Sequence, residues 1–182
     1  MGGFGYVLAD LARYTASDEV IFEAGSGPDS TPYLARVAHL YGVQLISVDV
    51  SDGHDAVDWL AATTPTRRIR FAYLDSWDWP YPGLGGYGEQ VEAEYAARGA
   101  AYGEDPSAAH HLALAEQVAR RALPGALVVF DDTWLTPEGW TGKGRDAVPW
   151  LLNRGWGLFA RHLDEKPEPS RHNAFYAALE RS

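Results

Sequence analysis

Acidic residues stand at the ends of several apolar runs in this chain. The segment LVVFDDTW (127–134) has the apolar run of a strand that is buried on both faces, and it ends on two adjacent aspartates, Asp131 and Asp132. A further apolar run, RIRFAYLDSW (68–77), carries Asp75 near its end. Neighbouring carboxylates repel each other, and strand propensity does not favour them. A partner must therefore offset the charge of the adjacent pair.

A glycine turn follows another apolar strand, in EAGSGPDS (23–30). Gly25 and Gly27 allow a sharp bend and a close approach to a ligand, and the helix N-terminus behind them favours a negative group. Asp49 ends the next strand, where an acid can accept both hydroxyls of a ribose. Together these features predict a cofactor that contains a nucleoside, although a tight turn and a loop aspartate without any ligand would look the same. The last position of the turn is serine, so the spacing is not that of a dinucleotide fingerprint.

The elements that must position these residues alternate between short apolar strands and amphipathic helices, which is typical of a parallel α/β sheet. We expect strands at 20–27, 43–50, 68–77 and 126–132, helices at 4–14, 30–42, 55–63, 88–98, 107–123 and 143–155, and a final antiparallel hairpin from 157–163 and 173–179. Ligands of open α/β sheets bind outside the carboxyl ends of the strands. Each of the four parallel strands brings an acid to that edge: Glu23, Asp49, Asp75, and the pair Asp131 and Asp132.

Composition limits the classes of partner. The 182 residues fit a single domain, 1–182, and a net charge of -10 makes nucleic acid and anionic membranes unfavourable partners. No apolar run approaches the roughly 18 residues that a membrane span needs. The N-terminal segment has no basic region before its apolar part, and the chain has no cysteine, so we expect a cytoplasmic protein.

The motifs resemble a known family. The Glu-x-Gly-x-Gly of the first strand, with an acid ending the second, resembles class I S-adenosylmethionine-dependent methyltransferases. YLDSWDW (73–79) followed by LPGALVVFDD (123–132) is similar to the divalent-metal-dependent O-methyltransferases of catechol and macrocin type. GKGRDAVPWLLNRG (142–155) also resembles the helix that follows the acidic pair in macrocin-type enzymes. The resemblance covers about residues 20 to 155.

The resemblance implies a Rossmann-like three-layer sandwich, with a mostly parallel sheet and a C-terminal antiparallel hairpin. The usual strand order of that family is 3-2-1-4-5-7-6. The segment between Asp49 and Asp75 is long enough for only one helix and one strand, so we expect the third, edge strand to be missing. The tip of that strand normally helps to hold the adenine.

The resemblance also implies two sets of ligands. Asp75, Asp131 and Asp132 would bind Mg²⁺ or another divalent cation, in agreement with the preference of that ion for oxygen ligands. The alternative is that Asp131 or Asp132 only caps a loop. S-adenosylmethionine would contact Glu23, Gly25, Ser26, Gly27, Ser30, Asp49 and Trp77.

Two side chains are candidates for the catalytic base. Asp78 stands where catechol-type enzymes have a lysine, and it would otherwise be a fourth metal-binding acid or a surface charge. Only one of His110 and His111 can face the site from a helix, and we take His111; both would otherwise be surface histidines. The long segment 80–106, rich in glycine and tyrosine, is expected to form a lid over the substrate.

We therefore predict an S-adenosylmethionine-dependent, Mg²⁺-assisted O-methyltransferase that acts on a small-molecule hydroxyl, such as that of a phenol, a sugar or a natural-product intermediate. One alternative is a non-catalytic module that binds a cofactor or a metal. A less favoured alternative is a metal-dependent phosphohydrolase. The tryptophans and the final hairpin are also compatible with a homodimer.

Overall fold

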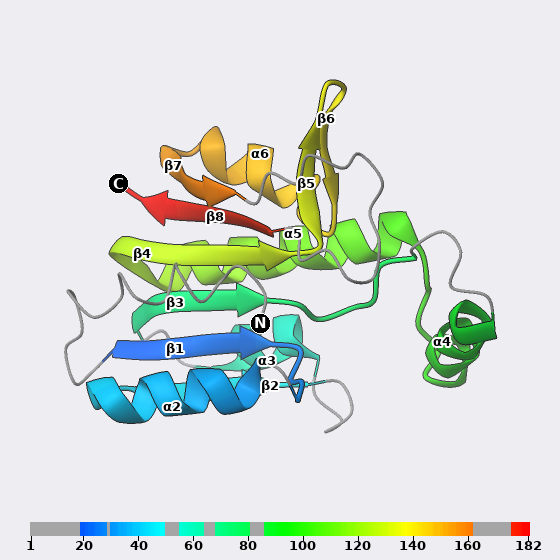
Figure 1. Ribbon diagram of the computed structural model, residues 1–182, viewed down its shortest axis with the longest axis horizontal. Helices are drawn as coiled ribbons and strands as arrows, with labels where there is room; N and C mark the ends of the chain where they lie inside the picture. The colour runs from blue at the N-terminus through cyan, green and yellow to red at the C-terminus, as the bar shows by residue number, and fades with distance from the viewer. Residues whose placement is uncertain (1–18, 29, 50–54, 64–67, 81–85, 162–175) are drawn as a thin grey trace.

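The computed structural model describes residues 19–28, 30–49, 55–63, 68–80, 86–161 and 176–182 (Figure 1). Six strands form one sheet in the order β2-β1-β3-β4-β8-β7. Their bounds are β1 (Glu19–Ala24), β2 (Gln44–Val48), β3 (Arg68–Leu74), β4 (Ala122–Asp131), β7 (Trp156–Arg161) and β8 (Tyr176–Arg181).

The strand order confirms the predicted fold class. β2, β1, β3 and β4 are parallel, and β8 joins β4 in the antiparallel sense and pairs with β7 as a hairpin. This is the order 2-1-4-5-7-6 of the predicted fold, and β2 is the edge strand of the sheet that the described residues form. The helix expected at 4–14 lies outside the described residues.

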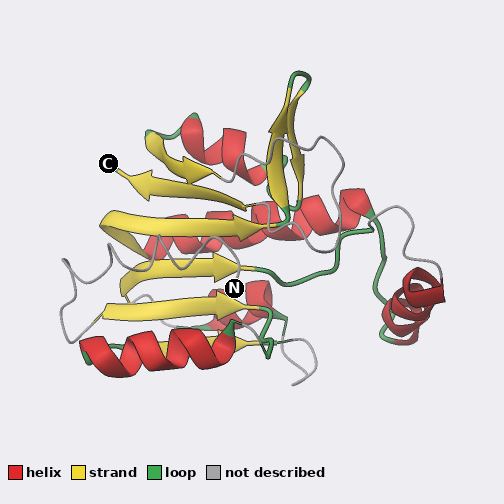
Figure 2. Ribbon diagram, in the orientation of Figure 1, coloured by secondary structure: helices red, strands yellow, loops and turns green. Residues whose placement is uncertain are grey.

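Helices cover both faces of the sheet (Figure 2). α2 (Thr31–Tyr41) packs on one face, and α3 (Ala56–Ala62), α5 (Glu104–Arg121) and α6 (Ala147–Leu152) pack on the other. The sheet has a hydrophobic core on each face. Alternate residues of β1 belong to these two cores, because side chains along a strand point to opposite faces. Ile21 belongs to the core beneath α2, whereas Val20 and Phe22 belong to the core that includes α5.

Local sequence explains where α2 begins and ends. Pro32 lies in its first turn, and Gly42 ends the helix with a left-handed φ of 65°. Ser30 occupies the N-cap position, but its side chain makes no capping hydrogen bond. The hydroxyl of Thr31 accepts from the Gly27 amide instead, at 3.0 Å, which fastens the glycine turn to the helix.

Two elements extend beyond the carboxyl ends of the parallel strands (Figure 1). α4 (Gly86–Ala97) falls within the predicted lid and agrees with the helix expected there. The second element, a hairpin of β5 (Thr133–Thr136) and β6 (Gly139–Gly142), was not predicted. Residues 143–146 form turns after it, so α6 is shorter than the predicted helix 143–155.

None of the helices that the structure describes combines the length and the apolar composition needed to cross a bilayer.

Candidate functional site

The carboxyl ends of β1, β2 and β3 are held together at Gly25. The Gly25 amide donates to the Val48 carbonyl at 2.9 Å, and the Asp75 amide donates to the Ala24 carbonyl at 2.8 Å. A Cβ at Gly25 would lie 2.6 Å from the carbonyl carbon of Asp75, and φ is +89°. Only glycine allows this approach without displacing backbone.

Glu23 is completely buried beneath the glycine turn. Its Oε2 accepts from the hydroxyls of Thr31, at 2.8 Å, and Ser47, at 2.6 Å. Its Oε1 is also buried, and none of the described residues donates a hydrogen bond to it. A buried carboxylate oxygen without a donor is costly, so this atom is suited to receive a donor from a ligand.

Asp49 lies directly beyond β2 and contacts the glycine turn. Its Oδ2 accepts from the Ser26 amide at 2.9 Å. The structure therefore brings together the predicted cofactor residues of the first two strands: Glu23, Gly25, Ser26, Gly27, Ser30 and Asp49.

Asp75, Asp131 and Asp132 form an acidic cluster at the ends of β3 and β4. Each contributes one carboxylate oxygen to a group whose members all lie within 4.8 Å of one another. The Tyr73 hydroxyl donates to Asp131 Oδ2 at 2.9 Å and lies 3.4 Å from Asp75 Oδ2. Burial, reinforced by the charges of Asp75 and Asp132, raises the pKa of Asp131 well above its usual value. Burial also raises the pKa of Asp75, although the charge of Lys143 opposes this shift.

Lys143 supplies a cation to this cluster. Its Nζ lies 2.6 Å from Asp75 Oδ1 and 3.0 Å from Asp132 Oδ2, and its side chain is only 4% exposed. Burial alone would lower the pKa of Lys143, but the neighbouring carboxylates outweigh burial and raise that pKa well above its usual value. The side chain is therefore a charged ammonium at neutral pH, and it offsets the repulsion between the aspartates.

The β5–β6 hairpin places Lys143 there. The Lys143 amide donates to the Asp132 carbonyl at 3.0 Å. Gly142, with φ of +83°, passes so close to Asp132 that a Cβ would lie 1.9 Å from its carbonyl oxygen. The Thr133 hydroxyl donates to the Asp131 carbonyl and accepts from the Gly144 amide, each at 2.9 Å. The two ends of the hairpin are thus joined beside the acidic pair.

The predicted divalent ion can be tested against these contacts. The three carboxylates have the donor type that Mg²⁺ prefers, and their oxygens are close together. The Lys143 ammonium, however, contacts oxygens of two of the three ligands, Asp75 and Asp132. The cluster as it is arranged does not fit a divalent ion together with this ammonium.

His111 is fully buried on α5, and its two ring nitrogens differ in their surroundings. Its Nδ1 lies 2.8 Å from the Ser107 carbonyl, which can only accept, so Nδ1 carries the proton. Its Nε2 is buried and has no hydrogen-bond partner among the residues described. Burial, together with the charge of Lys143, lowers the pKa of His111 well below its usual value. The result is a neutral imidazole whose lone pair is on the buried Nε2.

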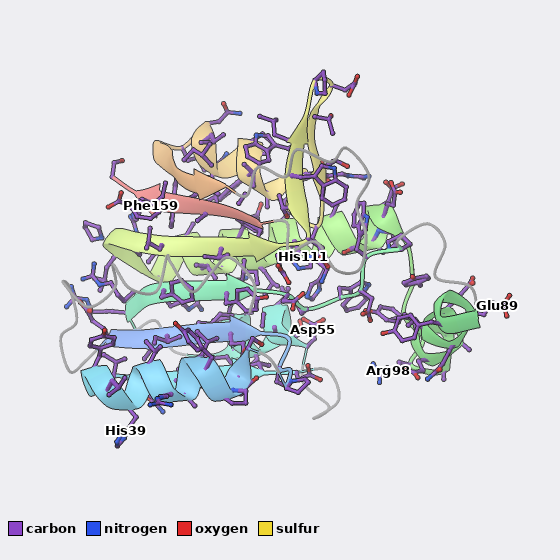
Figure 3. All side chains as sticks on the ribbon, viewed as in Figure 1. His39, Asp55, Glu89, Arg98, His111 and Phe159 are labelled. Carbon is purple, nitrogen blue, oxygen red and sulfur yellow. The ribbon has the colours of Figure 1, made fainter. Side chains whose placement is uncertain are left out.

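His110 has different surroundings from those of its neighbour. Its Nε2 lies 3.0 Å from the Ser76 hydroxyl, and its Nδ1 lies 3.7 Å from Asp55 Oδ2. Its ring stacks on Trp77 with centroids 4.5 Å apart. Figure 3 shows His111 and Asp55 near the carboxyl ends of the parallel strands, with Arg98 farther out at α4.

A pocket of about 190 Å³ lies beside Trp77. The residues that line it come from the start of α3, the segment after β3 and the region of α4: Asp55, Trp77, Tyr95, Arg98 and Ala100. Trp77 has a positive φ of 69° and donates from Nε1 to the Ala101 carbonyl at 3.1 Å. Its ring is therefore fixed at the border of this pocket.

Asp78 contacts α4 rather than the acidic cluster in the hydrogen bonds that the structure records. Its amide donates to the Tyr95 hydroxyl at 2.7 Å, and that hydroxyl lies 3.2 Å from Asp78 Oδ2. Asp78 is exposed at this position. These contacts fasten α4 to the end of β3, and the predicted role of Asp78 as a base stays a prediction.

No protein-family model matches the sequence, and no curated protein matches it. Solved structures do match. A protein-(glutamine-N5) methyltransferase, specific for release factors, from Alicyclobacillus acidocaldarius aligns with a TM-score of 0.53 and 18% identity, over 97% of this chain and 88% of that one. The Streptococcus mutans protein SMU.1697c, a proposed methyltransferase in complex with SAH, aligns with a TM-score of 0.53 and 12% identity, over 97% of this chain and 96% of that one. The chain has the class I methyltransferase fold. At these identities the likeness shows the methyltransferase fold and does not by itself define the activity.

Sequence reasoning missed two residues of the methyltransferase-fold site. Tyr73 stands two residues before Asp75, so strand alternation alone places the two side chains on one face, and the residue could have been included. Lys143 could be found only by predicting the hairpin. The signal for that hairpin was the turn-forming segment Pro137-Glu138-Gly139, in which Pro137 and Glu138 separate TWLT from GWTG.

Proposed function

We propose that this chain is an S-adenosylmethionine-dependent O-methyltransferase that acts on a small-molecule hydroxyl. The observation that carries the proposal is the buried Oε1 of Glu23, which receives no hydrogen bond from the described residues, at the glycine turn of a methyltransferase fold. S-adenosylmethionine has a primary ammonium group, which can donate to such an oxygen. The presence of SAH in the Streptococcus mutans structure supports the same cofactor for this chain.

The residues that we propose for the ribose and the adenine lie at the same edge of the sheet as Glu23. We propose that Asp49 accepts the ribose hydroxyls, because it ends β2 and lies against the glycine turn. We place the adenine in the pocket beside Trp77, whose ring offers a face for stacking. This pocket would replace the contact that the tip of the third strand makes in the usual form of this fold, a strand that the described sheet lacks.

In the proposed reaction, the acceptor oxygen attacks the methyl carbon of the sulfonium. A carbon–oxygen bond forms as the carbon–sulfur bond breaks, S-adenosylhomocysteine leaves, and a base takes the hydroxyl proton. We assign the base to His111, since none of the described residues bonds to its Nε2 lone pair and its Nδ1 proton is fixed by Ser107. Asp78 is the second candidate, and the contact between its carboxylate and Tyr95 makes it the weaker one.

The Mg²⁺-assisted form of the reaction that the sequence predicts is the alternative to the metal-free form proposed here. Asp75, Asp131 and Asp132 would hold the ion, which would lower the pKa of the acceptor hydroxyl. Such an ion would first have to displace the Lys143 ammonium. The steps above therefore use only side chains of the chain itself.

The acceptor and the cellular setting are inferred from composition. A net charge of -10 disfavours a nucleic-acid acceptor, and aromatic side chains on α4, including Tyr87 and Tyr95, suit a phenol or a glycoside. We also propose a cytoplasmic location, in line with the absence of cysteine. Homodimer formation is compatible with the exposed Leu158 and Phe159 of β7.

The test is formation of S-adenosylhomocysteine from S-adenosylmethionine in the presence of a panel of catechols, monophenols and glycosides. We expect formation that depends on the acceptor in the wild type, and a loss of roughly 10²–10⁴-fold in His111→Asn, because that is the usual contribution of a general base. His39→Asn, at the exposed end of α2, is the matched control and should retain full activity.

Two other outcomes would favour the alternatives. Binding of S-adenosylmethionine without transfer to any acceptor of the panel would favour the non-catalytic module. Metal-dependent release of phosphate from p-nitrophenyl phosphate, without cofactor binding, would favour the phosphohydrolase.

A further inference from the structure

We propose that the Lys143 ammonium takes the place of a divalent ion in the acidic cluster, so that the native chain binds no divalent ion there. The consequence for catalysis, methyl transfer without a metal, rests on the proposed function. The inference that the native chain binds no divalent ion in this cluster does not depend on that function.

The Lys143 ammonium contacts two of the three aspartates in the acidic cluster. Nζ is 2.6 Å from Asp75 Oδ1 and 3.0 Å from Asp132 Oδ2, so it lies between the ends of two neighbouring strands. The remaining acid, Asp131, receives the Tyr73 hydroxyl at 2.9 Å. All three carboxylates that would bind an ion therefore have a donor from the chain itself.

Backbone contacts fix the position of Lys143. Its own amide is bound to the Asp132 carbonyl, and Gly142 before it makes an approach to Asp132 that a side chain would prevent. The chain has only two lysines, Lys143 and Lys166, and uses arginine for its other cationic side chains. The Lys143 side chain is only 4% exposed and bonds to Asp75 and Asp132. It is therefore a buried part of the site and not a surface cation.

An ion and the ammonium exclude each other. Mg²⁺ holds its oxygens at about 2.0–2.1 Å and keeps several waters, so it would need the volume that Nζ now fills. Two cations sharing the same carboxylate oxygens in this partly buried site would also repel each other. Removal of the lysine side chain should leave three clustered carboxylates without a cation, which is a site for a divalent ion.

The experiment measures binding of Mn²⁺, followed by the loss of the electron paramagnetic resonance signal of the free ion. Wild-type protein should show no stoichiometric site. Lys143→Met should gain one site and bind Mn²⁺ at least about tenfold more tightly than the wild type, which corresponds to ~1.4 kcal/mol. Asp131→Asn, added to Lys143→Met, should remove that site.

Arg145→Met is the matched control. It removes the same charge two residues further on, from a side chain that pairs with Glu104, Asp105 and Asp146 and makes no recorded contact with the acidic cluster. Like the wild type, this variant should show no stoichiometric Mn²⁺ site. Lys143→Arg, which keeps a cation in place, should also gain no site.

A stoichiometric Mn²⁺ site in the wild type that Asp131→Asn abolishes would overturn the proposal. So would a folded Lys143→Met protein that binds no Mn²⁺. If Lys143→Met does not fold alone, refolding with Mn²⁺, but not with NaCl of equal ionic strength, supports the proposal, and failure to refold with Mn²⁺ overturns it.

These readouts do not involve the cofactor. A chain that does not bind S-adenosylmethionine would disprove the proposed function and leave the Mn²⁺ result intact. If methyl transfer is observed, the same inference predicts an unchanged rate in the presence of EDTA.

Discussion

The two carboxylate oxygens of Glu23 differ in their surroundings. Oε2 joins α2 to β2 through the hydroxyls of Thr31 and Ser47, whereas Oε1 is buried with no donor among the residues described. One residue therefore has both a structural role and the position of a ligand contact. The sequence could predict that Glu23 lies at the cofactor site, but not that one of its oxygens is used by the fold.

Glu23→Gln should weaken the binding of S-adenosylmethionine roughly tenfold to a hundredfold, because a hydrogen bond to a charged group contributes about 1.5–3 kcal/mol. Calorimetric titration measures this change. Glu19→Gln is the control at the other end of β1, where the carboxylate pairs with Arg70 at 2.6 Å. It should lower stability and leave cofactor affinity unchanged; equal losses of affinity in the two variants would contradict the assignment.

His111 gives a prediction for the pH dependence of the rate. Its pKa in the folded protein is lowered below the ordinary 6.5, chiefly by burial, so the neutral base persists as pH falls past that value. The acidic limb of kcat/KM should therefore lie below about pH 6.5. A limb above that pH would exclude His111 as the base.

The same shift has a consequence for stability. A depressed histidine pKa means that the folded state favours the neutral ring, so the stability that it contributes is complete above pH 6.5 and is lost as pH falls toward the lowered pKa. His111→Asn, which can keep a donor for the Ser107 carbonyl, should lose part of this acid sensitivity in urea unfolding measured between pH 7 and pH 5. An unchanged pH dependence would mean that other groups cause it.

At the scale of elements, the glycine turn depends on the approach of β1 to β3. Gly25→Ala should lower the free energy of unfolding by about 2–4 kcal/mol, since its Cβ would meet backbone atoms of Asp75 and Ser76 within 2.7 Å at a positive φ. Gly27→Ala is the matched substitution, because among the described residues its Cβ would approach the Ser30 hydroxyl alone, at 3.6 Å. It should change stability by less than about 1 kcal/mol. Urea unfolding of the two variants makes the comparison, and equal effects would contradict this account of the turn.

The elements also show where sequence reasoning succeeds and where it stops. The apolar runs predicted β1, β3 and β4 because parallel strands are buried on both faces. The β5–β6 hairpin was missed because its strands are only four residues each and lie outside the main sheet. Missing the hairpin meant missing Lys143, whose contacts depend on the way the chain returns to Asp132.

At the scale of the whole molecule, the strand order could be inferred from the resemblance and from the short connection between Asp49 and Asp75. The pocket beside Trp77 could not, because it combines residues from the start of α3, the segment after β3 and the region of α4. Trp77 itself was a predicted cofactor residue. Its partners Tyr95 and Arg98 are distant in sequence, and no local pattern pairs them with it.

Net charge predicts the behaviour of the molecule toward nucleic acids. At -10, the chain should show no binding to a fluorescently labelled RNA or DNA oligonucleotide in an anisotropy titration, even at low salt, where phosphate contacts are strongest. Saturable binding would contradict the proposal of a small-molecule acceptor.

The most direct test of the central claim is calorimetric titration of S-adenosylmethionine, and separately of S-adenosylhomocysteine, into the wild-type chain in the presence of EDTA. The account predicts one site per chain for each ligand, with a Kd in the micromolar range, and weaker binding in Glu23→Gln. A folded chain that binds neither ligand would contradict the claim that this edge of the sheet is a cofactor site.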